Sequence, residues 1–387
     1  MSCSRYSNIS VIVRLVNRRV KKVSFVSLCY WEVFNMYKKK LSVVLVIMMV
    51  AVLAFSGCSK SEDKPAGDAG GSDDTTVYTM KMSTADAEGS AYDLGIIQPM
   101  KKMLDEKSNG RLQLEIYYSA SLSKQGETLN DIRSGTLEMG SDVLTFYPGE
   151  YMYTELFGTP GINVGGLKEV SEVFNEYAKE FPEKGLDDFV IMVRWASGSF
   201  CYIDAKDEIR KVEDLKGKTL RATPNFIPWY TEMGANGTFM PITEVYEGLK
   251  LNVISGAHAT LQGTNTFNLY EVTNTMTMLP MVNGDQLIAL SRAYYDSLPE
   301  DLQKVIDEVQ GEMLPIAIDA WEKDEASAKD NILKFNPDFK FIDIAASDVG
   351  GFMDAAGGLL DAKAKELDAA GLKGTDALKW LRDRSKI

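Results

Sequence analysis

Side chains that commonly carry out covalent or metal chemistry are scarce in this sequence. It contains one histidine, His258, and four cysteines among 387 residues. A single histidine makes a serine triad, a cysteine–histidine pair or an H-E-x-x-H zinc site hard to build, and no cysteine cluster offers a metal site. There is also no Walker loop and no G-x-G-x-x-G segment. The residues therefore predict no catalytic centre, no metal and no cofactor, although paired carboxylates for glycoside hydrolysis stay open among so many acids.

The N-terminal region has the pattern of a lipoprotein signal peptide. Three lysines precede the uncharged apolar run 41–55, and Ser56-Gly57-Cys58 follows it. A helix of this length rises about 22 Å, short of the roughly 30 Å hydrocarbon core, so a transmembrane anchor is the less favoured alternative. We expect residues 1–57 to be a leader, in which residues 36–57 form the signal peptide and residues 1–35 lie upstream of the true start. Cys58 is then the lipid-modified N-terminus.

Charge changes sharply after this leader. The whole chain has a formal net charge of −13, and the part after residue 57 has −21, because nine Lys or Arg and a single acid lie before it. Such a surface repels phosphate backbones, so we expect no nucleic-acid partner. Residues 58–76 lack apolar periodicity and predict a flexible tether. After Cys58 only Cys201 remains, which predicts no intramolecular disulfide and a small buried apolar role for this thiol.

From residue 77 onward, strand and helix patterns alternate, which predicts an α/β fold with parallel βαβ units. Strands are expected at 77–84, 111–119, 138–145, 189–195, 219–222 and 253–256. Helices are expected at 91–107, 125–133, 166–181, 227–233, 243–252, 264–270, 299–335, 347–370 and 375–384. Gly311 and Pro315 should kink the longest of these helices.

Several segments resemble one family, the extracytoplasmic solute receptors of TRAP transporters, of which the C4-dicarboxylate-binding type is the best known. Residues 213–221 read EDLKGKTLR and resemble its D-L-K-G-x-K-[IL]-R segment, and residues 243–249 read TEVYEGL and resemble its [ST]-E-V-Y-x-A-L helix. Shorter matches are KSNGR at 107–111, SGTLEMG at 134–140, YEV at 270–272 and LPEDL at 298–302. The matches keep the family order from about residue 77 to about residue 333.

The resemblance implies a two-domain fold like that of periplasmic binding proteins, with a ligand cleft between the domains and a long helix spanning both. We expect domain I at 77–197 plus about 286–325, and domain II at 198–285 plus about 326–387. Closure of the cleft would trap a small organic acid and present it to the membrane permease of a TRAP transporter. The protein would then be an extracytoplasmic receptor, held to the membrane by its lipid in a periplasm or on the outer cell surface.

The resemblance also implies a ligand clamp. In the family, the arginine that ends the K-x-x-R strand usually holds a ligand carboxylate, and Arg221 occupies that place; a structural salt bridge is the alternative. Ala259 stands where the family often has asparagine, and Phe200 stands where it often has a second arginine. These differences argue against a dicarboxylate or sialic-acid pocket and favour a monocarboxylate with an apolar or aromatic body.

Other candidate ligand-binding residues come from strand ends and from the aromatic side chains near the expected cleft. They are Trp195, Phe200, Tyr147, Tyr151, Trp229, His258, Glu88 and Thr84. Each of the aromatic residues has a second interpretation as part of the core. At the level of function, a lipid-anchored extracellular enzyme and a solute sensor without a permease are the alternatives to a transport receptor.

Overall fold

The structure is a computed structural model that describes residues 75–198, 200–282 and 284–386. The leader, Cys58 and all but the last two residues of the predicted tether lie outside the described residues. None of the described helices combines the length and apolar character needed to cross a membrane.

The first sheet has five strands in the order β2-β1-β3-β10-β4. Its strands are β1 (Tyr78–Ser83), β2 (Leu112–Tyr117), β3 (Met139–Asp142), β4 (Phe189–Ala196) and β10 (Asp285–Ser291). Strand β1 pairs in parallel with β2 and β3, whereas β10 lies antiparallel between β3 and β4. Strand β4 is apolar at almost every position because helices α5 and α10 pack against it.

The second sheet has six strands in the order β11-β9-β5-β8-β6-β7. Its strands are β5 (Cys201–Ala205), β6 (Thr219–Arg221), β7 (Asn236–Thr238), β8 (Gly256–Ala259), β9 (Thr275–Leu279) and β11 (Lys340–Asp343). Strand β6 runs parallel to both β7 and β8, and β5 runs antiparallel to β8 and β9. The chain passes between the two sheets twice through strands, from β4 to β5 and from β9 to β10.

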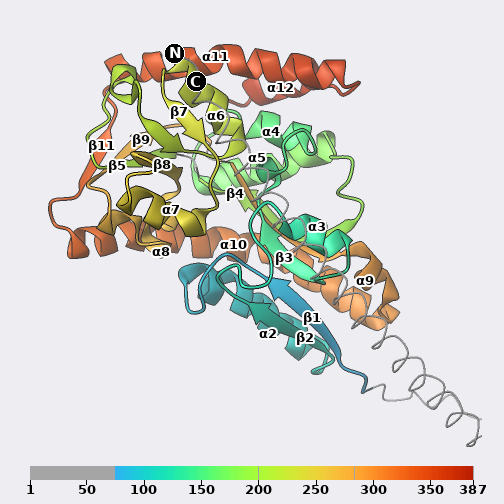
Figure 1. The fold of residues 1–387 in the computed structure, drawn as a ribbon. Helices are drawn as coiled ribbons and strands as arrows, with labels where there is room; N and C mark the ends of the chain where they lie inside the picture. Colours follow the sequence, from blue (N-terminus) through green and yellow to red (C-terminus); the bar gives the residue numbers. More distant parts are fainter. Residues whose placement is uncertain (1–74, 199, 283, 387) are drawn as a thin grey trace, which may run out of the picture. The chain divides into compact units, whose positions relative to one another are not determined.

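Helices and short helical turns connect the strands (Figure 1). The longer helices are α2 (Gln98–Lys107), α5 (Leu167–Glu180), α7 (Ile242–Lys250), α10 (Glu300–Phe335), α11 (Ala346–Ala369) and α12 (Gly374–Arg382). The shorter ones are α3 (Thr128–Arg133), α4 (Met152–Phe157), α6 (Ile227–Glu232), α8 (Leu261–Thr266) and α9 (Arg292–Ser297). Single turns are η1 (Asp93–Ile97), η2 (Leu144–Phe146), η3 (Val212–Leu215), η4 (Pro224–Phe226) and η5 (Leu269–Glu271).

Helix α10 has 36 residues and contacts elements of both sheets, among them α2 and β4 around the first and α8 around the second. In Figure 1 it is the long orange helix that extends alongside both sheets. Helix α10 continues without interruption through Gly311 and Pro315. The expected α/β fold, with a long helix that contacts the elements around both sheets, is therefore confirmed.

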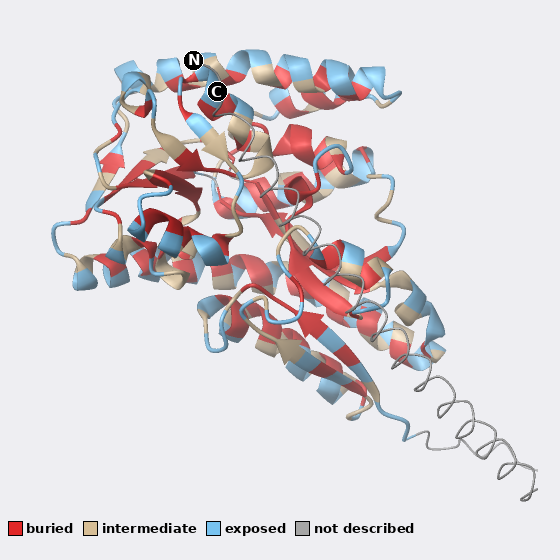
Figure 2. Cartoon of the chain, viewed as in Figure 1, coloured by how far each residue is buried: buried red, intermediate tan, exposed pale blue. Residues whose placement is uncertain are grey.

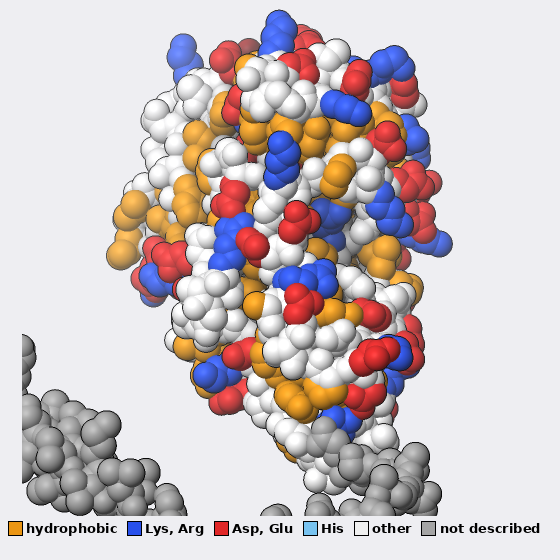
Figure 3. Space-filling model, turned by 90° about the vertical axis from the view of Figure 1, so that its right-hand side faces the viewer, with side chains coloured by type: hydrophobic (Ala, Val, Ile, Leu, Met, Phe, Trp, Pro, Cys, Tyr) orange, Lys and Arg blue, Asp and Glu red, His pale blue; other side chains and the backbone are white. Residues whose placement is uncertain are grey.

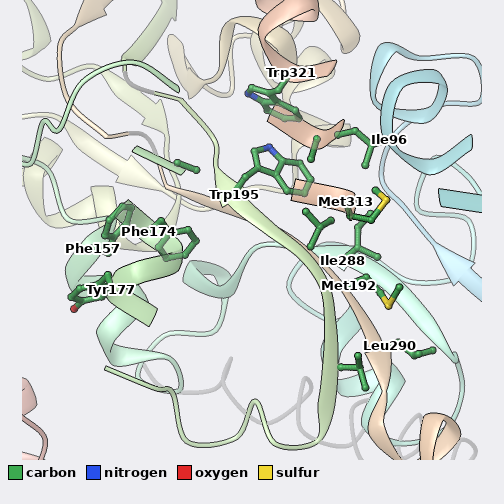
Figure 4. Close-up of a cluster of buried hydrophobic side chains, with 14 of the residues drawn as sticks. Ile96, Phe157, Phe174, Tyr177, Met192, Trp195, Ile288, Leu290, Met313 and Trp321 are labelled. Carbon is green, nitrogen blue, oxygen red and sulfur yellow. The ribbon is translucent and has the colours of Figure 1, made fainter. Parts of the chain in front are cut away.

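Buried side chains concentrate on the strands and on the inner faces of the helices (Figure 2). The largest core cluster surrounds the first sheet, where Trp195, Met192 and Ile288 lie against Met313 and Trp321 of α10 (Figure 4). On the face shown in Figure 3, acidic and basic side chains are interspersed among smaller apolar areas.

Two element predictions differ from the structure. The strand expected at 253–256 is instead β8 at Gly256–Ala259, because Leu251 and Val253 are exposed in the turn that ends α7. The helix expected at 264–270 starts earlier, at Leu261, because the side chain of Thr260 caps it by accepting a hydrogen bond from the N–H of Gly263.

Candidate functional site

A cavity lies where chain segments from the two sheets meet. It measures about 100 Å³, several times the roughly 10–15 Å³ that one water molecule needs on the same measure. Strands β1, β3, β6 and β8 supply its walls through the residues at or just after their carboxyl ends, which is where α/β sheets commonly bind ligands. The lining residues are Asp86, Tyr92, Gln125, Val143, Thr145, Phe146, Ser197, Arg221, Thr223, Ile242, His258, Ala259, Thr260, Gln262, Gly263, Thr266, Phe267, Gly284, Gln286, Trp321 and Asp324.

Arg221 ends strand β6 and lies in the cavity wall, with only 4% of its surface exposed. The turn that leads into this strand depends on Gly217, whose φ of 75° is the left-handed conformation that glycine adopts without strain. The Nε of Arg221 donates a hydrogen bond to the carbonyl of Met240 over 2.8 Å, and its Nη1 donates to the carbonyl of His258 over 2.6 Å. These two bonds fix the plane of the guanidinium.

Within the described residues, no carboxylate forms an ion pair with Arg221 and its Nη2 makes no hydrogen bond. Burial lowers the pKa of Arg221 to about 10, which still leaves the guanidinium charged at neutral pH. A buried guanidinium that lacks an acidic partner is costly, since the protein has removed the water that would otherwise solvate the charge. The cavity wall therefore carries a buried positive charge that no described carboxylate neutralises.

His258 lies on β8 beside Arg221 and is 2% exposed. Its ring centroid is 4.0 Å from that of Phe226 and 6.2 Å from that of Tyr230, so the imidazole is packed among aromatic rings. The main contribution of this residue to the cavity is structural, because its carbonyl accepts the Nη1 bond that orients Arg221.

Two carboxylates also line the cavity. Asp86 follows β1 and accepts one hydrogen bond, from the hydroxyl of Thr84 over 3.3 Å. Asp324 lies on α10 and is 6% exposed. Burial raises the pKa of Asp86 to about 7 and that of Asp324 to about 6, and each shift is increased by a neighbouring negative charge. The cavity thus combines a cation with two acids that burial holds away from their ordinary pKa.

Aromatic rings form the apolar part of the wall. Tyr92, Phe146, Phe267 and Trp321 line the cavity. The rings of Tyr92 and Trp321 meet edge to face at 6.1 Å, and the indole of Trp321 donates a hydrogen bond to the carbonyl of Ser197. These rings suit a ligand with a flat or apolar body.

Two other carboxylates, both buried, accept hydrogen bonds from backbone N–H groups of loops whose side chains line the cavity. Asp285 accepts hydrogen bonds from the N–H groups of Leu144 and Thr145, and Asp142 accepts from those of Gly126 and Val143. Because these loops bear Gln125, Thr145 and Phe146, the two acids position side chains that line the cavity. Burial raises the pKa of Asp142 to about 7 and that of Asp285 to about 6.

The structure brings two of the predicted ligand-binding residues, Arg221 and His258, to the cavity wall. Trp195 lies one layer behind it, fully buried, with its ring 5.9 Å from Tyr92 and 5.7 Å from Trp321. Thr84 is also one step removed, because it is buried and hydrogen-bonded to Asp86 and Ser141.

The other predicted residues lie away from the cavity lining. Tyr147 donates a hydrogen bond to Asp142, and Tyr151 accepts one from Arg133, within a separate core cluster beside the first sheet. Trp229 is buried in the core of the second sheet and donates to the carbonyl of Phe352. Phe200 is 38% exposed beside Tyr202, and Glu88 is exposed.

Several lining residues were not anticipated from the sequence, notably Asp86, Gln125, Trp321 and Asp324. Asp86 had a usable signal, since it is a carboxylate two residues beyond the predicted Thr84 at a strand end. Trp321 and Asp324 had none, because both lie in a long amphipathic helix where an aromatic residue indicates core and an acid indicates solvent.

Comparison with known proteins decides the family. Residues 82–366 match the model of bacterial extracellular solute-binding protein family 7. The chain belongs to this family. A solute-binding protein of Chromohalobacter salexigens is 24% identical over 251 residues, which cover 61% of this chain and 71% of that protein.

Solved structures of other solute-binding proteins share the fold of this chain. A TRAP solute-binding protein of Rhodoferax ferrireducens with copurified benzoate has a TM-score of 0.73 at 19% identity, covering 80% of this chain and 97% of that one. A marine-metagenome TRAP solute-binding protein specific for aromatic acids, crystallised with 3-hydroxybenzoate, has a TM-score of 0.74 at 21% identity, covering 80% and 98%. The resemblance to TRAP receptors is thereby confirmed, and the protein is an extracytoplasmic solute receptor of this type rather than an enzyme.

Proposed function

We propose that this receptor captures a small organic acid by clamping its carboxylate on Arg221 and delivers it to a TRAP permease. The observation that carries this proposal is the buried guanidinium in the cavity wall, which has no ion-pair partner among the described carboxylates. A guanidinium presents a planar fork that matches the two oxygens of a carboxylate, and such charge-assisted hydrogen bonds strengthen when water is excluded.

The fixed orientation of Arg221 supports the clamp over a purely structural role. Its Nε and Nη1 are held by the carbonyls of Met240 and His258, whereas Nη2 has no partner in the described part of the chain. A ligand carboxylate could therefore bind without any rearrangement of the side chain, which limits the entropic cost of binding.

The aromatic lining supports a monocarboxylate with an apolar or aromatic body. Tyr92, Phe146 and Trp321 supply the apolar surface, and among the described lining residues Arg221 is the one lysine or arginine. One cation favours one carboxylate, because a second anionic group would face Asp86 or Asp324. The benzoate and 3-hydroxybenzoate bound by the two similar receptors are acids of this kind.

We further propose that the cavity closes as two domains approach each other, domain I at 77–197 plus about 286–325 and domain II at 198–285 plus about 326–387. Contacts that would hold such a closed state are present around the cavity. The amide of Asn225 donates to the carbonyl of Gly158 over 2.6 Å, and the rings of Phe146 and Phe239 meet at 5.3 Å. Each pair joins a segment from one proposed domain to a segment from the other.

The membrane connection is a separate part of the proposal. Lipid on Cys58 would tether the receptor beside its permease, and the charged, glycine-rich segment 58–76 would give it reach. Replacing Cys58 with serine should release the receptor from membranes and abolish incorporation of a labelled fatty acid. A Cys58→Ser receptor that stays in the membrane fraction would refute the anchor without affecting the ligand proposal.

A thermal-shift screen of the purified protein tests the ligand. The panel should hold aromatic and aliphatic monocarboxylates, dicarboxylates, and the uncharged amide of each acid. An acid at about 1,000 times its Kd should add about 4 kcal/mol of stability, or roughly 6 °C for a fold of about 310 residues. We expect an acid to shift the melt and its amide not to. An amide that works as well as its acid would show that Arg221 is not a carboxylate clamp.

A further inference from the structure

Asp324 is a buried carboxylate that the clamp does not use. It lies on α10, lines the cavity and is 6% exposed. Within the described residues its carboxylate takes part in no hydrogen bond and no ion pair, since the nearby Ser327 hydroxyl donates to its backbone carbonyl instead. Buried charged groups in folded proteins are normally paired, and those that lack a protein partner commonly mark a binding site.

Asp86 adds a second carboxylate to the same cavity. Its carboxylate accepts a hydrogen bond from the Thr84 hydroxyl and is close enough to Asp324 for the two negative charges to repel each other. No lysine or arginine other than Arg221 lines the cavity among the described residues. The described part of the chain therefore places one buried and one partly buried carboxylate in the same cavity, with no lysine or arginine other than Arg221 in its lining.

The charge balance of the cavity limits the ligand. A plain monocarboxylate would pair with Arg221 and leave Asp86 and Asp324 unpaired, while adding its own negative charge to the same space. A dicarboxylate would increase the repulsion further. A ligand with a carboxylate at one end and a positive group at the other would pair all three charged side chains of the lining.

We propose that the receptor binds a zwitterionic acid, in which Arg221 clamps the carboxylate while Asp324, together with Asp86, binds a cationic nitrogen. This rests on the proposed carboxylate clamp and narrows its substrate class. The rings of Tyr92 and Trp321 line the same cavity and would also suit a cationic nitrogen, because aromatic rings attract cations.

The pH dependence separates this proposal from binding of a plain acid. The titratable and charged groups around the two carboxylates are Tyr92 and Asp93 after β1, Glu325 on α10, and Arg221 and His258 from the second sheet. Because burial raises the pKa values of Asp86 and Asp324 to about 7 and about 6, lowering the pH from 8 to 5 protonates both. Affinity for a cationic nitrogen should then fall, whereas affinity for a plain acid should rise.

The experiment compares matched probes by titration calorimetry on the purified protein. The pairs are 3-(aminomethyl)benzoate with 3-ethylbenzoate, and 4-aminobutyrate with pentanoate, and the members of each pair differ only by an ammonium in place of a methyl group. We expect the ammonium member of at least one pair to bind at least tenfold more tightly at pH 8, and to lose that advantage at pH 5. Asp324→Asn should remove the difference within the pair, because it weakens binding of the ammonium probe and, by removing a nearby negative charge, strengthens binding of the partner acid.

Glu322→Gln is the matched control, because Glu322 is exposed on the same helix two residues away and is absent from the cavity lining. It should leave the preference for the ammonium probe intact. Thermal melts of both variants confirm that they fold. If the acids without an ammonium group bind at least as tightly as their ammonium partners, the proposal of a zwitterionic ligand fails, whereas the proposed carboxylate clamp is unaffected. If no probe of either kind binds, the clamp and the zwitterion proposal fail together.

Discussion

Replacing Arg221 with methionine should abolish ligand capture while leaving the fold nearly as stable as before. Methionine keeps much of the length and the packing surface of arginine but removes its charge and its donors. The variant therefore separates two roles of the arginine. A ligand clamp predicts lost affinity with a small change in folding, and a structural ion pair predicts the opposite.

The magnitudes follow from the environment of the guanidinium. Removing one member of a buried, hydrogen-bonded charge pair costs about 2–5 kcal/mol of binding, which is roughly 30-fold to 5,000-fold in Kd. For folding, two effects nearly cancel. Burial lowers the pKa of Arg221 to about 10, so removing the charge recovers about 3 kcal/mol. Loss of the bonds to Met240 and His258 costs about as much.

The assay pairs calorimetry with a urea melt of the same preparation. We expect the free energy of unfolding without ligand to change by no more than about 2 kcal/mol, against the roughly 3–5 kcal/mol lost when a buried salt bridge is broken. Arg221→Lys is the matched variant, because it keeps the charge but not the planar fork, and its affinity should lie between those of the other two proteins. A methionine variant that binds the acid within tenfold of the original protein, or that unfolds outright, would refute the reasoning.

Three further predictions concern other parts of the described chain. Burial raises the pKa of Asp204 to about 7, above the value of about 4 expected in the unfolded chain. The protonated acid therefore stabilises the fold at acidic pH, and this contribution is lost as the pH rises from about 4 through about 7. Asp204→Asn should flatten this dependence, and urea melts should show it more stable than the original at pH 8, by at most on the order of 4 kcal/mol. Phe239→Ala should raise the ligand dissociation rate about threefold to tenfold in stopped-flow measurements, since the ring packs on Phe146 at the cavity; an unchanged rate would contradict its role in closure. Cys201 is fully buried and its thiol pKa is raised, so a thiol reagent should label it at least 100-fold more slowly in the folded than in the unfolded protein; fast labelling would show that the second sheet opens readily.

The sequence predicts the elements of this fold better than it predicts the site. Apolar patterns locate the longer helices and strands β1, β2, β3, β4 and β6 to within a few residues, because burial of one face imposes a period that is visible within a short segment. Strands β5, β7, β9, β10 and β11 were not predicted. The helix at 264–270 was misplaced for a local reason, since the cap at Thr260 moves its start. The strand expected at 253–256 failed because Val253 looks like a core residue in sequence but is exposed in a turn.

The site was harder to predict because its members come from distant segments. Arg221 was found through its place at the end of a recognisable motif, and His258 through its chemical rarity. Tyr147 and Trp229 looked like ligand contacts because they are aromatic and follow strand ends or prolines, yet both use their polar atoms inside the core. Whether an aromatic ring faces a cavity or a core depends on the packing of the other layers, which a single segment does not encode.

The cavity gains its specificity from groups that weaken the fold. Arg221 lacks a carboxylate and Asp324 lacks a donor within the described chain, and each is almost fully buried. Replacing a buried charge by an apolar residue of similar volume is often neutral or stabilising, so we expect neither group to be required for folding. Retaining them makes sense if a ligand supplies the missing partners, because the free energy spent on desolvating these charges is then recovered only when the right solute is bound. A solute lacking either charge recovers only part of it, so the same burial that destabilises the receptor also makes it selective.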